Sequence, residues 1–280
     1  MRLRPRQKTF VERSLAALGT HRNTLGIAPT GAGKTIMLSA VTGEVIGDSA
    51  AKACVLAHRD ELTDQNRGKF ARVNSGVTTS VIDASAKSWA GQVTFAMVPT
   101  LARTGNLAAM PQLDLLVIDE AHHAVAASYR RIIDQVRNAN PDARIFGVTA
   151  TPNRGDKKGL REVFDNVADQ VRLGELIVSG HLVPPRTFVI DVGVQDKLRA
   201  VRKTRADFDM AEVASIMDRA PVTDEVIRHW KEKAGDRQTV VFCSTVAHAA
   251  HVTEAFNAAD VPAALIHGDL ASETRKAILA

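Results

Sequence analysis

Residues 28–35 read APTGAGKT, and this stretch decides the fold class of the chain. It follows a short apolar run at residues 24–28 and precedes a helical pattern at residues 34–46. Gly31 and Gly33 allow the backbone to turn tightly between the two elements, so that its N–H groups can point at one anion. A strand, a glycine-rich turn and a helix N-terminus in this order are typical of a phosphate-binding loop.

The residues at the end of this loop indicate a nucleoside triphosphate with its metal ion. Lys34 would place a compact positive charge on the β- and γ-phosphates, and we expect it to act in catalysis. Thr35 would offer its hydroxyl group to Mg²⁺. The first loop position, which is commonly glycine, is Ala28 here. The residues predicted to bind ATP in the loop are Thr30, Gly31, Ala32, Gly33, Lys34 and Thr35.

A second motif, DEAH at residues 119–122, directly follows the apolar run LDLLVI. A carboxylate at the end of a parallel strand lies at the same edge of the sheet as the phosphate-binding loop. Asp119 is therefore expected to hold Mg²⁺, and Glu120 to position or deprotonate the attacking water. Two acidic residues at this place could also begin an ordinary capped helix. The upstream phosphate-binding loop favours the catalytic interpretation.

The wider pattern predicts an α/β protein with a central parallel sheet. Apolar runs at residues 24–28, 53–57, 93–98, 113–118 and 144–148 alternate with helical patterns at 34–46, 60–73 and 128–138. This alternation is typical of βαβ units. Pro184 and Pro185 then interrupt the pattern. We predict a first domain over residues 1–186 and a second, incomplete α/β domain over residues 187–280.

The second domain is predicted from a pattern that resumes after the prolines. Strand-like runs occur at residues 187–192, 239–243 and 263–267, and helical patterns at 222–234 and 246–259. The last helical pattern continues to Ala280 without a cap or a closing strand. On this basis we expect the domain to be unfinished.

Composition narrows the class of protein further. The chain has 280 residues, a net charge of +5 and 45% hydrophobic residues, which is ordinary for a globular protein whose partner could be a polyanion. Cys54 and Cys243 lie far apart, and the simplest interpretation is two reduced thiols in a cytoplasmic protein. We find no apolar run long enough to span a membrane and no secretory signal peptide.

Together, the motifs resemble those of the superfamily 2 helicases. APTGAGKT and DEAH are similar to motifs I and II, and other stretches match in the family's order. These are LRPRQ (3–7), VLAHRDELTDQ (55–65), TFAMVPTL (94–101), TATP (149–152), VVFCSTVAHA (240–249) and IHGDLASETRKAIL (266–279). The form of the second stretch resembles the DNA-directed branch related to repair helicases and type I restriction translocases.

The resemblance implies two RecA-like domains that enclose ATP and move along nucleic acid. In this scheme Gln7 reads the adenine base. His122 couples the nucleotide to Thr149 and Thr151. Arg59 and Thr100 contact the nucleic-acid backbone. DNA is the expected partner, with RNA as the alternative, and the sequence indicates no oligomeric state.

One feature departs from the family pattern. The family carries motifs V and VI in its second domain, and motif VI supplies an arginine that touches the γ-phosphate. No match to either motif occurs up to Ala280, so the sequence resembles a truncated helicase. An arginine of this kind can increase the rate by about 10³–10⁵-fold. An alternative function is therefore an ATP- and nucleic-acid-binding module with little turnover.

Overall fold

The computed structural model describes residues 2–47, 50–58, 60–152, 159–203 and 208–279 of the chain. These residues form two compact units, Met1–Pro184 and Pro185–Ala280. In the described residues, we find no helix that is both long enough and apolar enough to cross a lipid bilayer.

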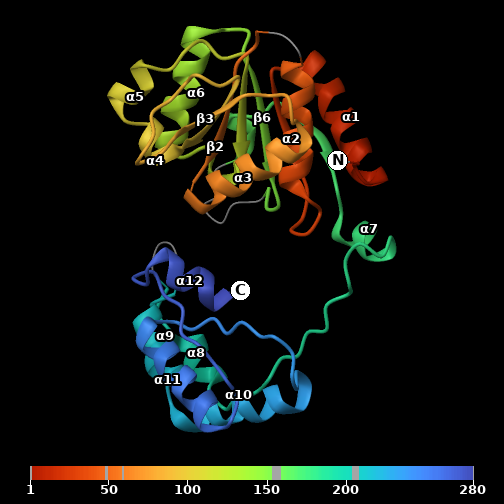
Figure 1. Ribbon diagram of the computed structural model, residues 1–280. Coiled ribbons are helices and arrows are strands. Elements are labelled where there is room, and N and C mark those ends of the chain that lie inside the picture. Colours follow the sequence, from red (N-terminus) through yellow and green to blue (C-terminus); the bar gives the residue numbers. More distant parts are fainter. Residues whose placement is uncertain (1, 48–49, 59, 153–158, 204–207, 280) are drawn as a thin grey trace. The chain divides into compact units, whose positions relative to one another are not determined.

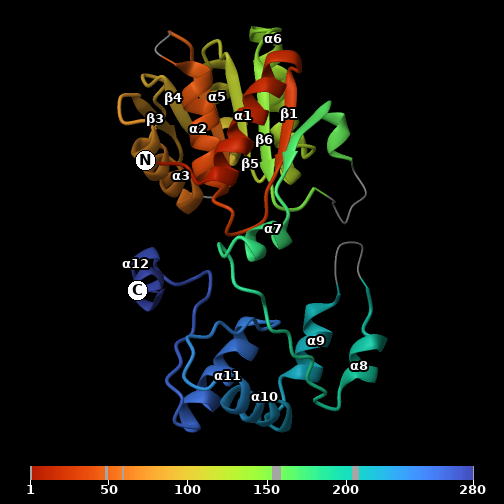
Figure 2. The same cartoon turned by 90° about the vertical axis from the view of Figure 1, so that its right-hand side faces the viewer.

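The first unit is built on a seven-stranded sheet in the order β3-β4-β2-β5-β6-β1-β7 (Figures 1 and 2). All neighbouring strands in the sheet are parallel. The strands are β1 (Asn23–Ile27), β2 (Ala53–Ala57), β3 (Thr79–Ile82), β4 (Val93–Met97), β5 (Leu115–Asp119), β6 (Arg144–Thr149) and β7 (Asn166–Gln170). The prediction of an α/β protein with a central parallel sheet is confirmed.

Helices cover both faces of this sheet, as parallel sheets require (Figure 1). One face carries α1 (Pro5–Thr20), α2 (Lys34–Ile46) and α3 (Asp60–Val73), which pack in that order. The other face carries α4 (Val98–Leu101), α5 (Thr104–Ala108) and α6 (Ala127–Ala139). The short helices η1 (Ala121–His123), η2 (Leu160–Glu162) and α7 (Leu173–Val178) lie in the connections.

The central strand β5 shows how the sequence produces two cores. Leu115 and Val117 point into the core beneath α1, α2 and α3, whereas Leu116 and Ile118 point into the core beneath α4 and α6. Side chains alternate across a strand, so a strand buried on both faces must be apolar throughout. Only Asp119 breaks this rule in β5. It is the last residue of the strand and lies at the edge formed by the carboxyl ends of the strands.

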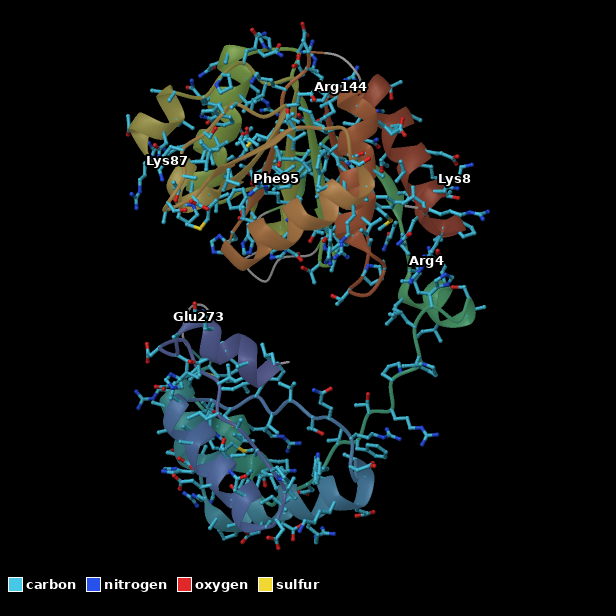
Figure 3. All side chains as sticks on the ribbon, viewed as in Figure 1. Arg4, Lys8, Lys87, Phe95, Arg144 and Glu273 are labelled. Atoms are coloured by element: carbon cyan, nitrogen blue, oxygen red, sulfur yellow. The ribbon has the colours of Figure 1, made fainter. Side chains whose placement is uncertain are left out.

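The strands of the sheet start at one edge and end at the opposite edge, and the two edges carry different groups. Arg144 begins β6 at the amino-terminal edge of the sheet, while Phe95 lies within the body of the unit (Figure 3). The opposite edge, where the strands end, carries the loop from β1 to α2, the turn after β5 and the end of β6. The helical ranges 34–46 and 60–73 match the predicted ones, and the five strands predicted in this unit agree within two residues at each end.

The second unit consists of helices joined by extended segments. The helices are α8 (Gln195–Ala200), α9 (Met210–Met217), α10 (Ala220–Lys233), α11 (Val246–Ala258) and α12 (Ser272–Leu279). A small core joins α10 and α11 through Ile227, Val252 and Phe256, with Trp230 edge-on to Phe256. Thr245 caps α11 by accepting a hydrogen bond from the backbone N–H of His248.

The three strands predicted in this unit are a correction to the sequence analysis. Residues 187–192, 239–243 and 263–267 belong to no strand ladder in the described part of the unit. A strand exists only when a neighbour accepts its hydrogen bonds, and the β-branched pattern reports propensity without supplying that neighbour. Several apolar side chains of these runs are exposed, and Phe242 has 93% of its surface accessible, whereas Val192, Cys243 and Ala263 pack against small cores of the unit.

Candidate nucleotide-binding site

The loop between β1 and α2 has the geometry that its glycines predict. Gly31 and Gly33 both adopt φ = 85°, in the left-handed region that favours glycine. Gly33 directly precedes Lys34, the first residue of α2, so the free N–H groups of that helix begin at the end of the loop. The loop is tied to the sheet by the backbone N–H of Ala28, which donates to the carbonyl of Thr149.

Lys34 and Glu120 come together from distant parts of the sequence. The Nζ atom of Lys34 lies 3.7 Å from Oε1 of Glu120, and the lysine side chain is only 13% exposed. The loop after β1 and the turn after β5 thus meet at one point on the carboxyl edge of the sheet. This arrangement places a cation for phosphates beside a carboxylate that can accept a proton.

Glu120 has an unusual backbone conformation. Its φ of 50° and ψ of 52° are left-handed, which few residues other than glycine adopt. Such a conformation costs on the order of 1 kcal/mol or more and is common at functional sites. It turns the chain sharply from β5 into η1. Nothing in the sequence signalled this strain, because glutamate has no special preference for the region.

Asp119 is a buried carboxylate held from two sides. Its Oδ1 accepts a hydrogen bond from the backbone N–H of Glu120 at 3.0 Å, and its Oδ2 accepts one from Nδ2 of Asn66 at 2.9 Å. Burial raises the pKa of Asp119, and the charge of Glu120 raises it further. The Asn66 hydrogen bond and the charge of Lys34 oppose this shift without cancelling it. A nearby positive charge would therefore stabilise the ionised form.

His122 connects this turn to the end of β6. Its Nδ1 atom lies 3.3 Å from Oε2 of Glu120 and 3.1 Å from Oγ1 of Thr149. Thr151 approaches the same nitrogen at 3.5 Å, and its backbone N–H donates to Oγ1 of Thr149. The structure thus brings together His122, Thr149 and Thr151, the three residues expected to act as a coupling group.

Gln7 joins the start of α1 to the phosphate-binding loop. Its Oε1 accepts from the backbone N–H of Arg4, and its Nε2 donates to the carbonyl of Ala32 at 3.0 Å. Gln7 also lines a small pocket together with Arg4, Met37 and His181. It therefore lies next to the loop, where an adenine-reading residue is required. Its role in reading the base stays a prediction.

The two predicted nucleic-acid contacts have different outcomes. Arg59 lies outside the described residues. Thr100 belongs to the short helix α4 and is only 3% exposed, and its carbonyl accepts a hydrogen bond from Nδ2 of Asn106. In this conformation its side chain presents little surface to a ligand, so a contact there stays a prediction.

Sequence reasoning missed two groups near the site. Asn66 was not singled out, because an asparagine in a polar helical pattern gives no signal. Arg6 was not singled out either, yet it pairs with Asp169 of β7 and with Glu175 of α7. Arg13 also pairs with Asp169, and these contacts fix α1 beside the edge strand. Only the fold shows that these charges, far apart in sequence, face each other.

The chain is similar to a restriction-enzyme family and to known helicases. Residues 1–154 match the family model described as type III restriction enzyme, res subunit. The chain is 27% identical over 82% of its length to the putative ATP-dependent helicase IRC3 of Saccharomyces cerevisiae, of which it covers 35%. It is 31% identical over 55% of its length to the ATP-dependent DNA helicase mph1 of Neurospora crassa, of which it covers 14%.

A solved structure has a related fold. The nuclease-deletion mutant of the Type ISP restriction-modification enzyme LlaGI, determined in complex with a DNA substrate mimic, aligns with 99% of this chain at a TM-score of 0.50 and 14% identity. The aligned region is 30% of the LlaGI chain. The protein therefore spans well under half the length of these relatives. The match over residues 1–154 shows that the chain belongs to the family of the type III restriction enzyme res subunit, within the superfamily 2 helicases that its motifs resemble.

Proposed function

We propose that this protein is the motor part of an ATP-driven DNA helicase or translocase. The proposal rests on a chain of contacts at one edge of the sheet. Lys34 contacts Glu120, Glu120 contacts His122, and His122 contacts Thr149, each at 3.7 Å or less. A glycine-rich loop at a helix N-terminus next to paired carboxylates has the parts that phosphoryl transfer needs.

In this proposal each residue has a defined task. The backbone of residues 30–33 and Lys34 bind the phosphates, and Gln7 reads the base. Glu120 accepts a proton from the water that attacks the γ-phosphorus, while the bond to the β,γ-bridging oxygen breaks and ADP leaves. His122, Thr149 and Thr151 pass the state of this site to the nucleic-acid surface. Arg59 and Thr100 are the proposed backbone contacts on that surface.

The residues present also fit Mg²⁺. Asp119 is a buried carboxylate, and Thr35 at the start of α2 supplies a hydroxyl oxygen. Oxygen atoms of this kind are the ligands that Mg²⁺ prefers. When bound, Mg²⁺ would neutralise charge on the β- and γ-phosphates. Asp119 and Thr35 are the residues that would hold it.

DNA is the nucleic acid on which we propose that the protein moves. Relatives include an ATP-dependent DNA helicase and, by the family description, restriction enzymes, which favours DNA over the RNA alternative. The net charge of +5 suits a polyanionic partner. Phosphate contacts dominate such binding, so affinity should fall steeply as salt increases. We propose a cytoplasmic location, although one relative carries the word mitochondrial in its name.

The test is ATP hydrolysis measured alone and with single-stranded DNA, double-stranded DNA or RNA of equal length. Stimulation by DNA that exceeds stimulation by RNA, and that declines with salt, is the expected result. Equal or greater stimulation by RNA would contradict the proposal that the protein acts on DNA. Nucleotide binding without hydrolysis under every condition would instead favour a binding module with little turnover.

A further inference from the structure

The buried face of α3 changes from apolar to polar as it approaches the carboxyl edge of the sheet. Phe70, in the later half of the helix, is fully buried and packs edge-on against Phe95 of β4. Asn66 and Thr63, four and seven residues earlier, lie on the same face and are each 2% exposed. An amide in such a place is costly unless its hydrogen bonds are made. Asn66 meets part of this requirement by donating from Nδ2 to Oδ2 of Asp119.

This hydrogen bond is well placed to fix the Asp119 carboxylate. Oδ2 of Asp119 accepts a hydrogen bond from Nδ2 of Asn66 at 2.9 Å, and Oδ1 accepts one from the backbone N–H of Glu120 at 3.0 Å. With one donor on each oxygen, rotation of the carboxylate is restricted. Each oxygen keeps further acceptor capacity for a metal ion or its water. The donor from Glu120 belongs to the adjacent backbone, whereas Asn66 comes from a separate helix.

We propose that Asn66 is a positioning residue that orients Asp119 for Mg²⁺ and thereby sets the affinity of the metal–nucleotide site. The proposal rests on the function proposed above, because it assigns Asp119 to the metal. Residues that hold metal ligands by hydrogen bonds tune both the orientation and the affinity of the site, and their loss typically weakens metal binding by about 10–100-fold. The same range is expected for Asn66.

The chain offers a matched control in Asn74. This asparagine follows the end of α3, is partly buried, and donates from Nδ2 to the carbonyl of Ser39 in α2 at 2.9 Å. Replacing it with alanine removes an amide and an interhelical hydrogen bond of the same length. Its Nδ2 also lies 3.5 Å from the carbonyl of Phe70, and neither Ser39 nor Phe70 is assigned to the metal. The two variants therefore separate a loss of packing from a loss of carboxylate orientation.

The experiment measures binding of Mn²⁺, as a paramagnetic substitute for Mg²⁺, to the protein saturated with ADP, by electron paramagnetic resonance. The variants are Asn66→Ala, Asn66→Leu, which fills the space without a donor, and Asn74→Ala. Thermal unfolding of each variant is recorded alongside. We expect Mn²⁺ affinity to fall by about 10-fold or more in both Asn66 variants and to stay unchanged in Asn74→Ala.

Two results would overturn the proposal. One is folded Asn66 variants that bind Mn²⁺ as tightly as the unmodified protein. The other is loss of cooperative unfolding in both Asn66 variants, which would assign the residue a structural role. Failure of the proposed function would look different, because the unmodified protein would then bind no metal–nucleotide complex or would fail to hydrolyse ATP.

Discussion

Nδ1 of His122 lies 3.1 Å from Oγ1 of Thr149, and this contact joins the turn after β5 to the end of β6. Both strands end at the edge that carries Lys34. The same imidazole lies 3.3 Å from Glu120, so one ring touches both the proposed base and the TATP stretch. In the proposed function, these two consecutive contacts would connect the γ-phosphate site at Glu120 to the end of β6.

The first prediction concerns this link. Thr149→Val keeps the shape of the side chain and removes its hydroxyl, so His122 and the backbone N–H of Thr151 each lose this partner. A hydrogen bond contributes about 0.5–1.5 kcal/mol, which corresponds to roughly 2- to 12-fold in rate. We expect DNA-stimulated ATP hydrolysis to fall by this factor, while ATP affinity is preserved. Steady-state hydrolysis at saturating DNA measures it.

A remote threonine provides the control for that measurement. Thr94 of β4 is buried and shares a hydrogen bond of 2.9 Å with Ser80 of β3, away from the site. Thr94→Val should reduce stability without changing DNA stimulation. An equal loss of stimulation in both variants would argue against a specific role for the His122–Thr149 contact.

The second prediction concerns the phosphate-binding lysine. Lys34→Ala removes the charge proposed for the β- and γ-phosphates, and hydrogen bonds to charged groups contribute about 1.5–3 kcal/mol. ATP affinity, measured by isothermal titration calorimetry, should fall by roughly 10- to 150-fold. Lys52→Ala is the matched control. It also removes a lysine that makes a hydrogen bond, since Nζ of Lys52 donates to the carbonyl of Trp89 before β4. Unchanged affinity in Lys34→Ala would remove the loop from the proposed site.

The sequence predicted that the glycine-rich loop and the DEAH turn lie at one edge of the sheet, because the signals for both are local. Gly31, Gly33 and Lys34 act through backbone freedom and helix position, which a short stretch determines. Asp119 was recognisable because a carboxylate directly follows an apolar strand. Strand β5 was predictable from its apolar run, since burial on both faces leaves no other composition.

The features that escaped prediction depend on contacts between distant segments. The edge strand β7 reads NVADQ, and this polar composition carries no strand signal. It is a strand because it pairs with β1, and its Asp169 pairs with Arg6 and Arg13. Asn66 could not be recognised from the sequence, because its hydrogen-bond partner Asp119 is distant along the chain. In the second unit the opposite error occurred. Apolar runs such as residues 239–243 predicted strands, but the described residues of the unit provide no partner strand.

The third prediction concerns stability and pH. Burial raises the pKa of Asp169, but hydrogen bonds and charges from Arg6 and Arg13 outweigh it and hold the pKa below its usual value. A carboxylate with a lowered pKa in the folded state stabilises the protein above its unfolded-state pKa of about 3.9, and this contribution disappears as the pH falls through the folded-state pKa. Asp169→Asn should therefore destabilise the first unit at neutral pH and lose this effect in acid.

Chemical denaturation across a pH series checks this. At neutral pH the expected loss for Asp169→Asn is about 1.5–3 kcal/mol, and the gap to the unmodified protein should narrow below about pH 4. Asp142→Asn breaks an exposed pair with Arg22 and should cost at most about 1 kcal/mol. A gap that widens as the pH falls would have the wrong sign for this explanation.

The fourth prediction concerns Tyr129 of α6. Its side chain is buried next to the site, and within the described residues its hydroxyl makes no hydrogen bond. Burial raises the pKa of this phenol, and the charges of Asp119 and Glu120 add to the shift. Removing an unsatisfied buried hydroxyl is close to neutral or stabilising. Tyr129→Phe should leave the denaturation midpoint unchanged or raise it, and a clear fall would mean that the hydroxyl has a partner.

The most direct test of the account is a comparison of ATP binding and ATP hydrolysis in Glu120→Gln and the unmodified protein, with Mg²⁺ and DNA present. Glutamine keeps the size of the side chain but cannot accept the proton, and a general base contributes roughly 10²–10⁴-fold to the rate. The account predicts that Glu120→Gln binds ATP at least as tightly as the unmodified protein while phosphate release falls by about this factor. Hydrolysis at an equal rate in both proteins would contradict the assignment of this edge of the sheet as the catalytic site.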